Sequence, residues 1–461
     1  MDKLIYASTT ELAQAISNGN ISSKEVVDVY LQRIEEVNPK LNAVVQLVAE
    51  EARVQAGEAD AALKRGEIKG PLHGVPMTVK DMVETKGAIC AAGTKGRASF
   101  IPTQDATVVA RLRNAGAILL GKTNMPELGL AFETDNLVYG RTNNPYNLSC
   151  IPGGSSGGEA AIIAAGGSPF GVSVDGGGSI RQPADCCGIV GIKPTQGRVP
   201  ATGCWPLSWL GLLTQTAGPN ARYVEDLGLI LSIIAGPDWH DPTTVSMPLG
   251  NPDEIDIKSL RVAVYTDNGI VTPTPEIIDV VQKAAKALSD AGMNVEEDYP
   301  EVINQTYEIL MGLYTADGGA GLKATLKMAG TTEMHPFMQG LLEICRNSAV
   351  TTAEFSALMM KWTNFRRSMH SFMENYDVII SPVSAFPAPK HGESFEKFPG
   401  FSYTMSYNLT GWPGAVVRVG TSPEGLPIGI QIVARPWRED VALAVAKYIE
   451  QKFGGWQPPS I

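Results

Sequence analysis

Short apolar segments alternate with amphipathic helical patterns along this chain of 461 residues, and this alternation limits the folds open to it. Apolar runs typical of buried strands lie at 74–81, 117–120, 170–174, 188–192, 261–265, 378–381, 415–420 and 427–433. Helical spacing of apolar residues marks 105–116, 158–166, 275–291 and 438–452. Such alternation is typical of a sheet buried between helices. It predicts an α/β fold with a large mixed, mostly parallel twisted sheet covered by helices on both faces.

Helices are also expected before and within this sheet-forming sequence. Residues 8–11 and 22–25 both read Ser-x-x-Glu, the capping-box pattern that opens a helix, and Pro39 is expected to end the second one. The stretch 300–375 is mostly helical and rich in Met, which suggests either an adaptable apolar lining or plain helical core. We expect one domain over 1–461, with a core at about 66–300 and 376–461, N-terminal helices at 8–65 and a helical insertion at about 300–375.

Composition excludes several classes of function. A net charge of −11 argues against nucleic acid or an anionic membrane as the main partner. No apolar run reaches the roughly 18 residues of a membrane span, and the first residues lack the pattern of a signal peptide. The six cysteines form no CxxC pair, which favours reduced thiols and a cytoplasmic location. The five histidines show no metal-ligand spacing, so neither a metal nor another cofactor is expected.

Two glycine- and serine-rich blocks carry the chemistry of the chain. Residues 152–158 read Pro-Gly-Gly-Ser-Ser-Gly-Gly, and 173–183 read Ser-Val-Asp-Gly-Gly-Gly-Ser-Ile-Arg-Gln-Pro. Successive free backbone N–H groups in such loops bind anions. The phosphate-binding motifs are absent, which leaves an oxyanion hole as the use of these groups. Ser179 directly follows three glycines, so its own N–H and the preceding ones can converge on one oxygen.

A nucleophilic serine needs a base. The G-x-S-x-G pattern of α/β hydrolases fails here, because Arg181 stands two residues after Ser179. With so few histidines, lysine is the leading candidate, and a lysine acts as a base only where burial lowers its pKa. Lys80 follows the apolar run 75–79, which fits a buried position.

Several longer motifs make the chain similar to one known family. They are Pro71-Leu72-His73-Gly74-Val75-Pro76, Lys80-Asp81, Gly121-Lys122-Thr123-Asn124-Met125-Pro126-Glu127, Asn143-Asn144-Pro145-Tyr146-Asn147, residues 152–158, Gly188 to Thr195, Gly218-Pro219 and Gly425 to Gln431. Together they resemble the amidase signature family of serine hydrolases over nearly the whole chain. Gly-Gly-Glu at 157–159 and Gly-Ser-Pro at 167–169 resemble the branch that holds fatty-acid-amide-hydrolase-like and aryl-amide or carbamate hydrolases.

The resemblance implies a Ser–cis-Ser–Lys triad. Ser179 would be the nucleophile, Ser155 the bridging serine after a cis peptide bond at Gly154, and Lys80 the base. The N–H groups of Gly176, Gly177, Gly178 and Ser179 would form the oxyanion hole. Val174 and Gly176 depart from the commoner family sequence, and Gly176 either widens the acyl pocket or loosens the oxyanion hole.

Residues around the triad receive supporting roles. Asp175 and Arg181 flank the nucleophile and are interpreted as an ion pair that holds the loop. Ser156 is expected to hydrogen-bond the loop or Lys80. Met125, Trp205 and Trp209 are candidate pocket residues, although the two tryptophans of the apolar loop 204–213 can equally pack inward.

These observations predict an amidohydrolase that cleaves C–N bonds through an acyl-enzyme. The apolar loop and the Met-rich insertion favour apolar or aryl amides, with carbamates as a further class of small-molecule substrate. The alternatives are a glutamine-hydrolysing protein that works with partner chains on charged tRNA, and a non-catalytic family member. A homodimer is left open.

Overall fold

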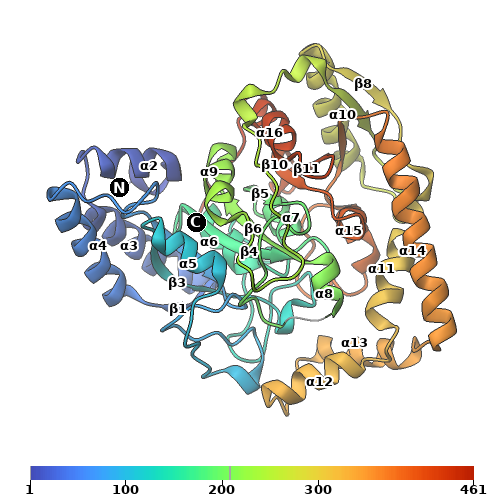
Figure 1. The fold of residues 1–461 in the computed structure, drawn as a ribbon, viewed down its shortest axis with the longest axis horizontal. Coiled ribbons are helices and arrows are strands. Elements are labelled where there is room, and N and C mark those ends of the chain that lie inside the picture. Colours follow the sequence, from blue (N-terminus) through green and yellow to red (C-terminus); the bar gives the residue numbers. More distant parts are fainter. Residues whose placement is uncertain (1, 207–208) are drawn as a thin grey trace.

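The computed structural model describes residues 2–206 and 209–461, and its centre is a sheet of eleven strands (Figure 1). The strands lie in the order β1-β3-β2-β4-β6-β5-β10-β11-β9-β7-β8. Their bounds are β1 Val44–Leu47, β2 Pro76–Lys80, β3 Ile118–Thr123, β4 Phe170–Asp175, β5 Val190–Lys193, β6 Thr216–Ala221, β7 Arg261–Val264, β8 Asn294–Glu297, β9 Val378–Pro382, β10 Gly414–Thr421 and β11 Pro427–Ala434.

The helices of the described residues surround this sheet. They are α1 Asp2–Ile5, α2 Thr9–Ser17, α3 Ser23–Leu41, α4 Ala49–Lys64, α5 Thr107–Asn114, α6 Gly157–Ala164, α7 Arg181–Cys186, α8 Trp209–Thr214, α9 Val224–Ile234, α10 Pro275–Asp290, α11 Thr306–Thr315, α12 Ala320–Ala329, α13 Pro336–Asn347, α14 Thr352–Met373, α15 Ser402–Leu409 and α16 Glu439–Phe453. Short 3₁₀ helices lie at 95–97, 127–129, 252–254, 257–259, 301–305 and 398–401.

The mixed α/β sheet is confirmed, but antiparallel strand pairings outnumber parallel ones, whereas a mostly parallel sheet was expected. Four of the ten strand pairings are parallel and six are antiparallel. One cause is β6, which inserts antiparallel between β4 and β5. Its sequence, Thr-Ala-Gly-Pro-Asn-Ala, carries no apolar run, so the pattern gave no sign of it. A second cause is the tight turn that makes β10 and β11 a hairpin, and apolar content does not encode strand direction.

Different helices cover the two faces of the sheet. In β9, Val378 and Ile380 belong to the apolar cluster that includes α10 and α16, whereas Ile379 belongs to a second cluster with α11, α14 and α15. Because successive strand residues point to opposite faces, these clusters lie on opposite sides of the sheet. The prediction of helices on both faces is therefore confirmed.

The N-terminal helices follow their sequence signals, with one exception. Both capping boxes are present, with Ser8 and Ser22 as the N-caps. Pro39 does not end α3, which continues to Leu41 and stops where Asn42 adopts a left-handed conformation. A proline near a C-terminus removes one N–H donor, whereas the left-handed residue is what ends the last turn.

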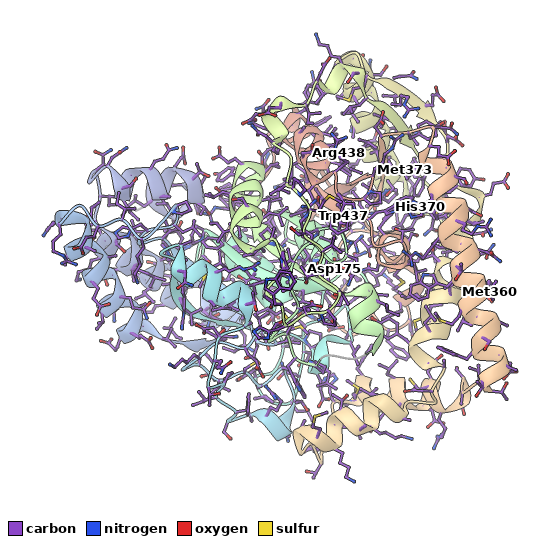
Figure 2. The ribbon with its side chains drawn as sticks, viewed as in Figure 1. Asp175, Met360, His370, Met373, Trp437 and Arg438 are labelled. Atoms are coloured by element: carbon purple, nitrogen blue, oxygen red, sulfur yellow. The ribbon has the colours of Figure 1, made fainter. Side chains whose placement is uncertain are left out.

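The segment 300–375 is helical as expected, and it forms α11 to α14 along one side of the molecule (Figure 1). Its methionines have mixed roles. Met369 and Met373 are buried in the core, whereas Met360 is 60 % exposed on the outer side of α14 (Figure 2). Most of this segment is therefore ordinary helical core or surface, and Met311 is the methionine of this segment that lines the cavity described below.

Two further expectations concern the chain as a whole. All six cysteines are buried and none is in a disulfide. Within 2–206 and 209–461, no helix has both the length and the apolar character needed to cross a membrane.

Candidate active site

Lys80 is the last residue of β2, and its side chain is completely buried. Burial disfavours the ammonium form and lowers the pKa of Lys80 to about 7, against the opposing charges of Asp175 and Glu159. The Nζ atom donates to the Oγ atom of Ser155 at 2.6 Å and approaches the carbonyl oxygen of Val174 at 3.5 Å. In the described part of the chain Lys80 forms no ion pair, so no carboxylate contacts its amine directly.

Ser155 lies in the loop that leads into α6, and the peptide bond between Gly154 and Ser155 is cis, as the resemblance implies. Its side chain is only 2 % exposed. Ser155 lines a cavity of about 380 Å³, and Ser179 lines the same cavity. The structure therefore brings Ser155 and Ser179 to the same cavity, and it places Lys80 in contact with the first of them.

The loop between β4 and α7 wraps around the carboxylate of Asp175. The N–H groups of Gly178 and Ile180 donate to this carboxylate at 2.7 Å and 3.1 Å. The N–H of Gly178 is thus already used, which removes Gly178 from the predicted oxyanion donors. The N–H groups of Gly176, Gly177 and Ser179 have no acceptor among the described residues, and Gly176 and Gly177 line the cavity.

Asp175 and Arg181 form the expected ion pair, and both side chains are fully buried. Asp175 lies near the centre of the molecule (Figure 2). Two of the guanidinium nitrogens donate to the carboxylate at 3.0 Å each. Burial alone would raise the pKa of Asp175, but the charge of Arg181 and the hydrogen bonds from Arg181 and Asn408 hold it well below its usual range. The pair therefore stays ionised and fixes the loop that carries Ser179.

The expectations for Ser156 and Met125 are wrong, and the one for Trp209 concerns a side chain outside those that the structure describes. The Oγ atom of Ser156 is buried but has no hydrogen-bond partner in the part of the chain described, so it bonds neither the loop nor Lys80. Met125 is buried in the apolar core and is not one of the described residues around the cavity, because its side chain packs beneath Gly129. The side chain of Trp209 lies outside the described residues.

Trp205 takes the inward-packing alternative rather than lining the cavity. The guanidinium carbon of Arg97 lies 4.0 Å from the centre of its ring. Its neighbour Pro206 reaches the cavity instead, after a cis Trp205–Pro206 bond. The apolar loop thus contributes to the cavity, although through a different residue from the one predicted.

The walls of the cavity are mainly apolar and come from distant segments. They include Met82 after β2, Leu128 and Phe132 after β3, Leu310, Met311 and Tyr314 of α11, Phe398, and Met405 of α15. Among the described lining residues there is no lysine, arginine or histidine, and Asp317 is the one carboxylate. Sequence reasoning missed most of these residues, because no local pattern relates α11 to the Gly/Ser loops.

Glu159 is a further buried residue that sequence reasoning assigned no role. Its carboxylate accepts hydrogen bonds from the hydroxyl groups of Thr78 and Thr123, the second at 2.8 Å. Burial raises its pKa to about 7. The sequence did contain a sign that Glu159 is unusual. It is the one charged residue of α6, and the rest of that helix is glycine, alanine and isoleucine.

The fold and this site define an amide hydrolase. Residues 25–443 match the Amidase family, so the chain belongs to this family, and it is an amidase that acts on amide C–N bonds.

Similar proteins include amide hydrolases and an amidotransferase subunit. The chain is 36 % identical to fatty-acid amide hydrolase 2-B of Danio rerio, with 99 % of this chain and 91 % of the relative covered. It is 33 % identical to a glutamyl-tRNA(Gln) amidotransferase subunit of Acinetobacter baumannii, with 98 % and 97 % covered. A solved bacterial aryl acylamidase of the amidase signature family superposes with a TM-score of 0.87 at 26 % identity, covering 97 % and 96 %.

Proposed function

We propose that the chain hydrolyses apolar and aryl amides, and carbamates, through an acyl-enzyme on Ser179. The Oγ atom of Ser179 attacks the carbonyl carbon and gives its proton to Ser155, whose own proton passes to the neutral amine of Lys80. The N–H groups of Gly176, Gly177 and Ser179 stabilise the oxyanion. The proton returns to the leaving amine as the C–N bond breaks, and water then hydrolyses the ester on Ser179.

The observation that carries this proposal is the 2.6 Å contact between Lys80 and Ser155 at a site with no ion-pair partner for the lysine among the described residues. A lysine acts as a base only when its amine is neutral. Burial lowers the pKa of Lys80 to about 7, so a large share of the amine is neutral under mild conditions. The same contact then lets the Ser155 hydroxyl donate to the lone pair of the amine.

The cavity supports an apolar acyl or aryl group as the specific part of the substrate. Leucine, methionine and phenylalanine side chains surround Ser155 and Ser179, and a volume of about 380 Å³ accommodates a group of aryl size. The similarity to fatty-acid amide hydrolase 2-B and to an aryl acylamidase points the same way.

The glutamine-hydrolysing role is the second candidate, because almost the whole length of the chain is similar to a protein of the glutamyl-tRNA(Gln) amidotransferase. Glutamine carries a carboxylate and an ammonium group that need charged or strongly polar partners. The described walls of the cavity offer the carboxylate no cationic side chain. We therefore place this role behind the hydrolysis of apolar amides.

A substrate panel with serine variants tests the proposal. The purified chain alone is incubated with anilides, aryl carbamates and glutamine, and release of aniline and glutamate is measured. We expect aniline release, a loss of roughly 10³-fold or more in Ser179→Ala, and a smaller but large loss in Ser155→Ala, where water can replace the relay. Ser156→Ala is the matched control, because its hydroxyl has no partner among the described residues, and it should keep near wild-type rates. Hydrolysis of glutamine alone would favour the second candidate.

We propose a single amidase domain, a cytoplasmic location consistent with free buried cysteines, and a small-molecule amide or carbamate as the main partner. A homodimer is compatible with all of these observations.

A further inference from the structure

Glu159 lies in a prepared position beside β2. A Cβ atom on Gly171 of β4 would overlap its carboxyl group, so the glycine clears the space that the carboxyl occupies. One carboxyl oxygen accepts from Thr78 and the other from Thr123. Two hydroxyl donors and a cleared space, all in the fully buried interior, indicate that this acid has a defined role rather than filling a gap.

The strand register relates this carboxyl to Lys80. Thr78 precedes Lys80 by two residues on β2, so both side chains point to the same face of the sheet. Thr123 is the neighbour of Lys80 across the β2–β3 pairing, and it lies on that face as well. Thr78 and Thr123, which hold the carboxyl, are therefore the nearest same-face positions to Lys80 along β2 and across to β3.

We propose that Glu159 is a positioning residue for Lys80, and that the charge of its carboxyl sets the pH at which the lysine amine loses its proton. This inference rests on the proposed role of Lys80 as the base. It assigns to Glu159 a function in the reaction although the residue lines no part of the cavity.

The other groups that act on Lys80 do not change charge near neutral pH. Asp175 of β4 is ionised and paired with Arg181. Burial raises the pKa of the Cys204 thiol to about 12, so this group stays neutral. Ser155 is uncharged. Among these groups, Glu159 is therefore the one whose charge varies in the range where the lysine titrates. Burial also raises the pKa of the next residue, Asp81, to about 7, but the charged group that acts on Asp81 is Lys122 and not Lys80.

The charge of Lys122, which precedes Thr123 on β3, also favours the charged form of the Glu159 carboxyl. Its own Nζ atom donates to the carbonyl oxygen of Val83 and to the hydroxyl of Thr85, the latter at 3.0 Å. It is therefore anchored away from the carboxyl, and the two threonine hydroxyls are the direct donors. An ionised Glu159 keeps the proton on Lys80, whereas a neutral one releases the lysine as a free amine.

The test measures kcat/KM of an uncharged anilide against pH in wild type and in Glu159→Gln. Glutamine preserves the shape but carries no charge, so the pH of half-maximal activity should fall by about half a unit or more. KM should stay within about twofold, because Glu159 does not touch the cavity. A midpoint that does not move, with the variant folded and active, would overturn the inference.

A second variant covers the case in which Glu159→Gln fails to fold. Thr123→Val removes one hydrogen bond that favours the carboxylate, so the midpoint should move in the same direction by a smaller amount. An unchanged or raised midpoint in that variant would also overturn the inference. Asp226→Asn is the matched control, since it removes another buried carboxylate, whose partners are Thr9 and Thr10 of α2, and it should leave the midpoint in place.

Lys80→Ala separates this inference from the proposed function. In wild type, kcat/KM is expected to rise with pH. If the residual activity of Lys80→Ala shows the same rise, Lys80 is not the base and the proposed function fails. If Lys80→Ala abolishes the rise but Glu159→Gln leaves it unmoved, the role of Lys80 stands and only the role of Glu159 is lost.

Discussion

At the scale of single residues, burial decides the charge state of the proposed base. Lys193 shows that burial alone is not enough, since burial lowers its pKa to about 7 as well. Lys193 donates to the carbonyl oxygen of Pro194 at 2.8 Å, and it does not line the cavity. What distinguishes Lys80 is its contact with the hydroxyl of Ser155, a residue that lines that cavity.

The first prediction at this scale concerns the pH dependence of the reaction. The working form of Lys80 is the free amine, so kcat/KM should rise as pH increases through about 7 and then reach a plateau. Lys80→Ala should remove the rise and most of the activity. Lys80→Arg should be no better, because a guanidinium remains charged across this range. Initial rates measured from acidic to alkaline pH provide the test, and an acidic optimum would contradict a neutral-lysine base.

At the scale of elements, the loop between β4 and α7 meets α11 of the helical segment. Gly176 is the point of contact, and the Tyr314 hydroxyl lies 3.5 Å from its carbonyl oxygen. A Cβ atom at Gly176 would lie 3.4 Å from that hydroxyl and 3.7 Å from Cβ of Gln215, which are ordinary contact distances. The glycine therefore leaves space on the cavity side of the loop.

The prediction for this contact is a change in acyl selectivity. Gly176→Ala should keep the fold and activity on acetanilide. Gly176→Ile should lower kcat/KM for a long-chain or aryl acyl anilide by about tenfold or more relative to acetanilide, because the side chain fills the acyl space. Comparison of the two substrates in each variant decides between the two interpretations of this glycine. An equal loss on both substrates would mean that the oxyanion N–H groups have been displaced.

At the scale of the whole molecule, buried ionisable groups connect segments that are far apart in sequence. Arg198 and Glu439 form a fully buried ion pair between the segment after β5 and α16. Asp185 of α7 accepts the N–H of Gly429 in β11 at 2.6 Å, and burial raises its pKa to about 7. The raised pKa of Asp185 makes global stability depend on pH.

The stability prediction follows from Asp185. Its pKa is near 3.8 when unfolded and about 7 when folded, so between these values the folded state binds more protons and stability falls as pH rises. Asp185→Asn keeps an acceptor for Gly429 without the titration. We compare the free energy of unfolding of the variant with that of wild type at each pH. This difference should be more favourable to the variant at about pH 8 than at about pH 5, by about 1 kcal/mol or more, since one pKa unit corresponds to about 1.4 kcal/mol. Urea unfolding of both proteins at both pH values provides the measurement. A difference between variant and wild type that is the same at the two pH values would contradict the assignment to Asp185.

The sequence by itself determined those features whose signal is local. The alternation of apolar runs and helical patterns predicted the α/β class and the positions of most strands. The run before Lys80 predicted its burial, and the glycines before Ser179 predicted free N–H groups beside that serine. Contiguous motifs were enough to indicate the family, because a short loop carries its chemistry in neighbouring residues.

Only the tertiary structure decided which of these groups meet and which are already occupied. The N–H of Gly178 turns to Asp175, Met125 packs into the core, and β6 enters the sheet without an apolar run. The cavity walls and the carboxyl of Glu159 depend on residues brought together by strand register and helix packing. No local pattern contains these contacts, because the partner of each side chain is set by the folded arrangement of segments distant in the chain.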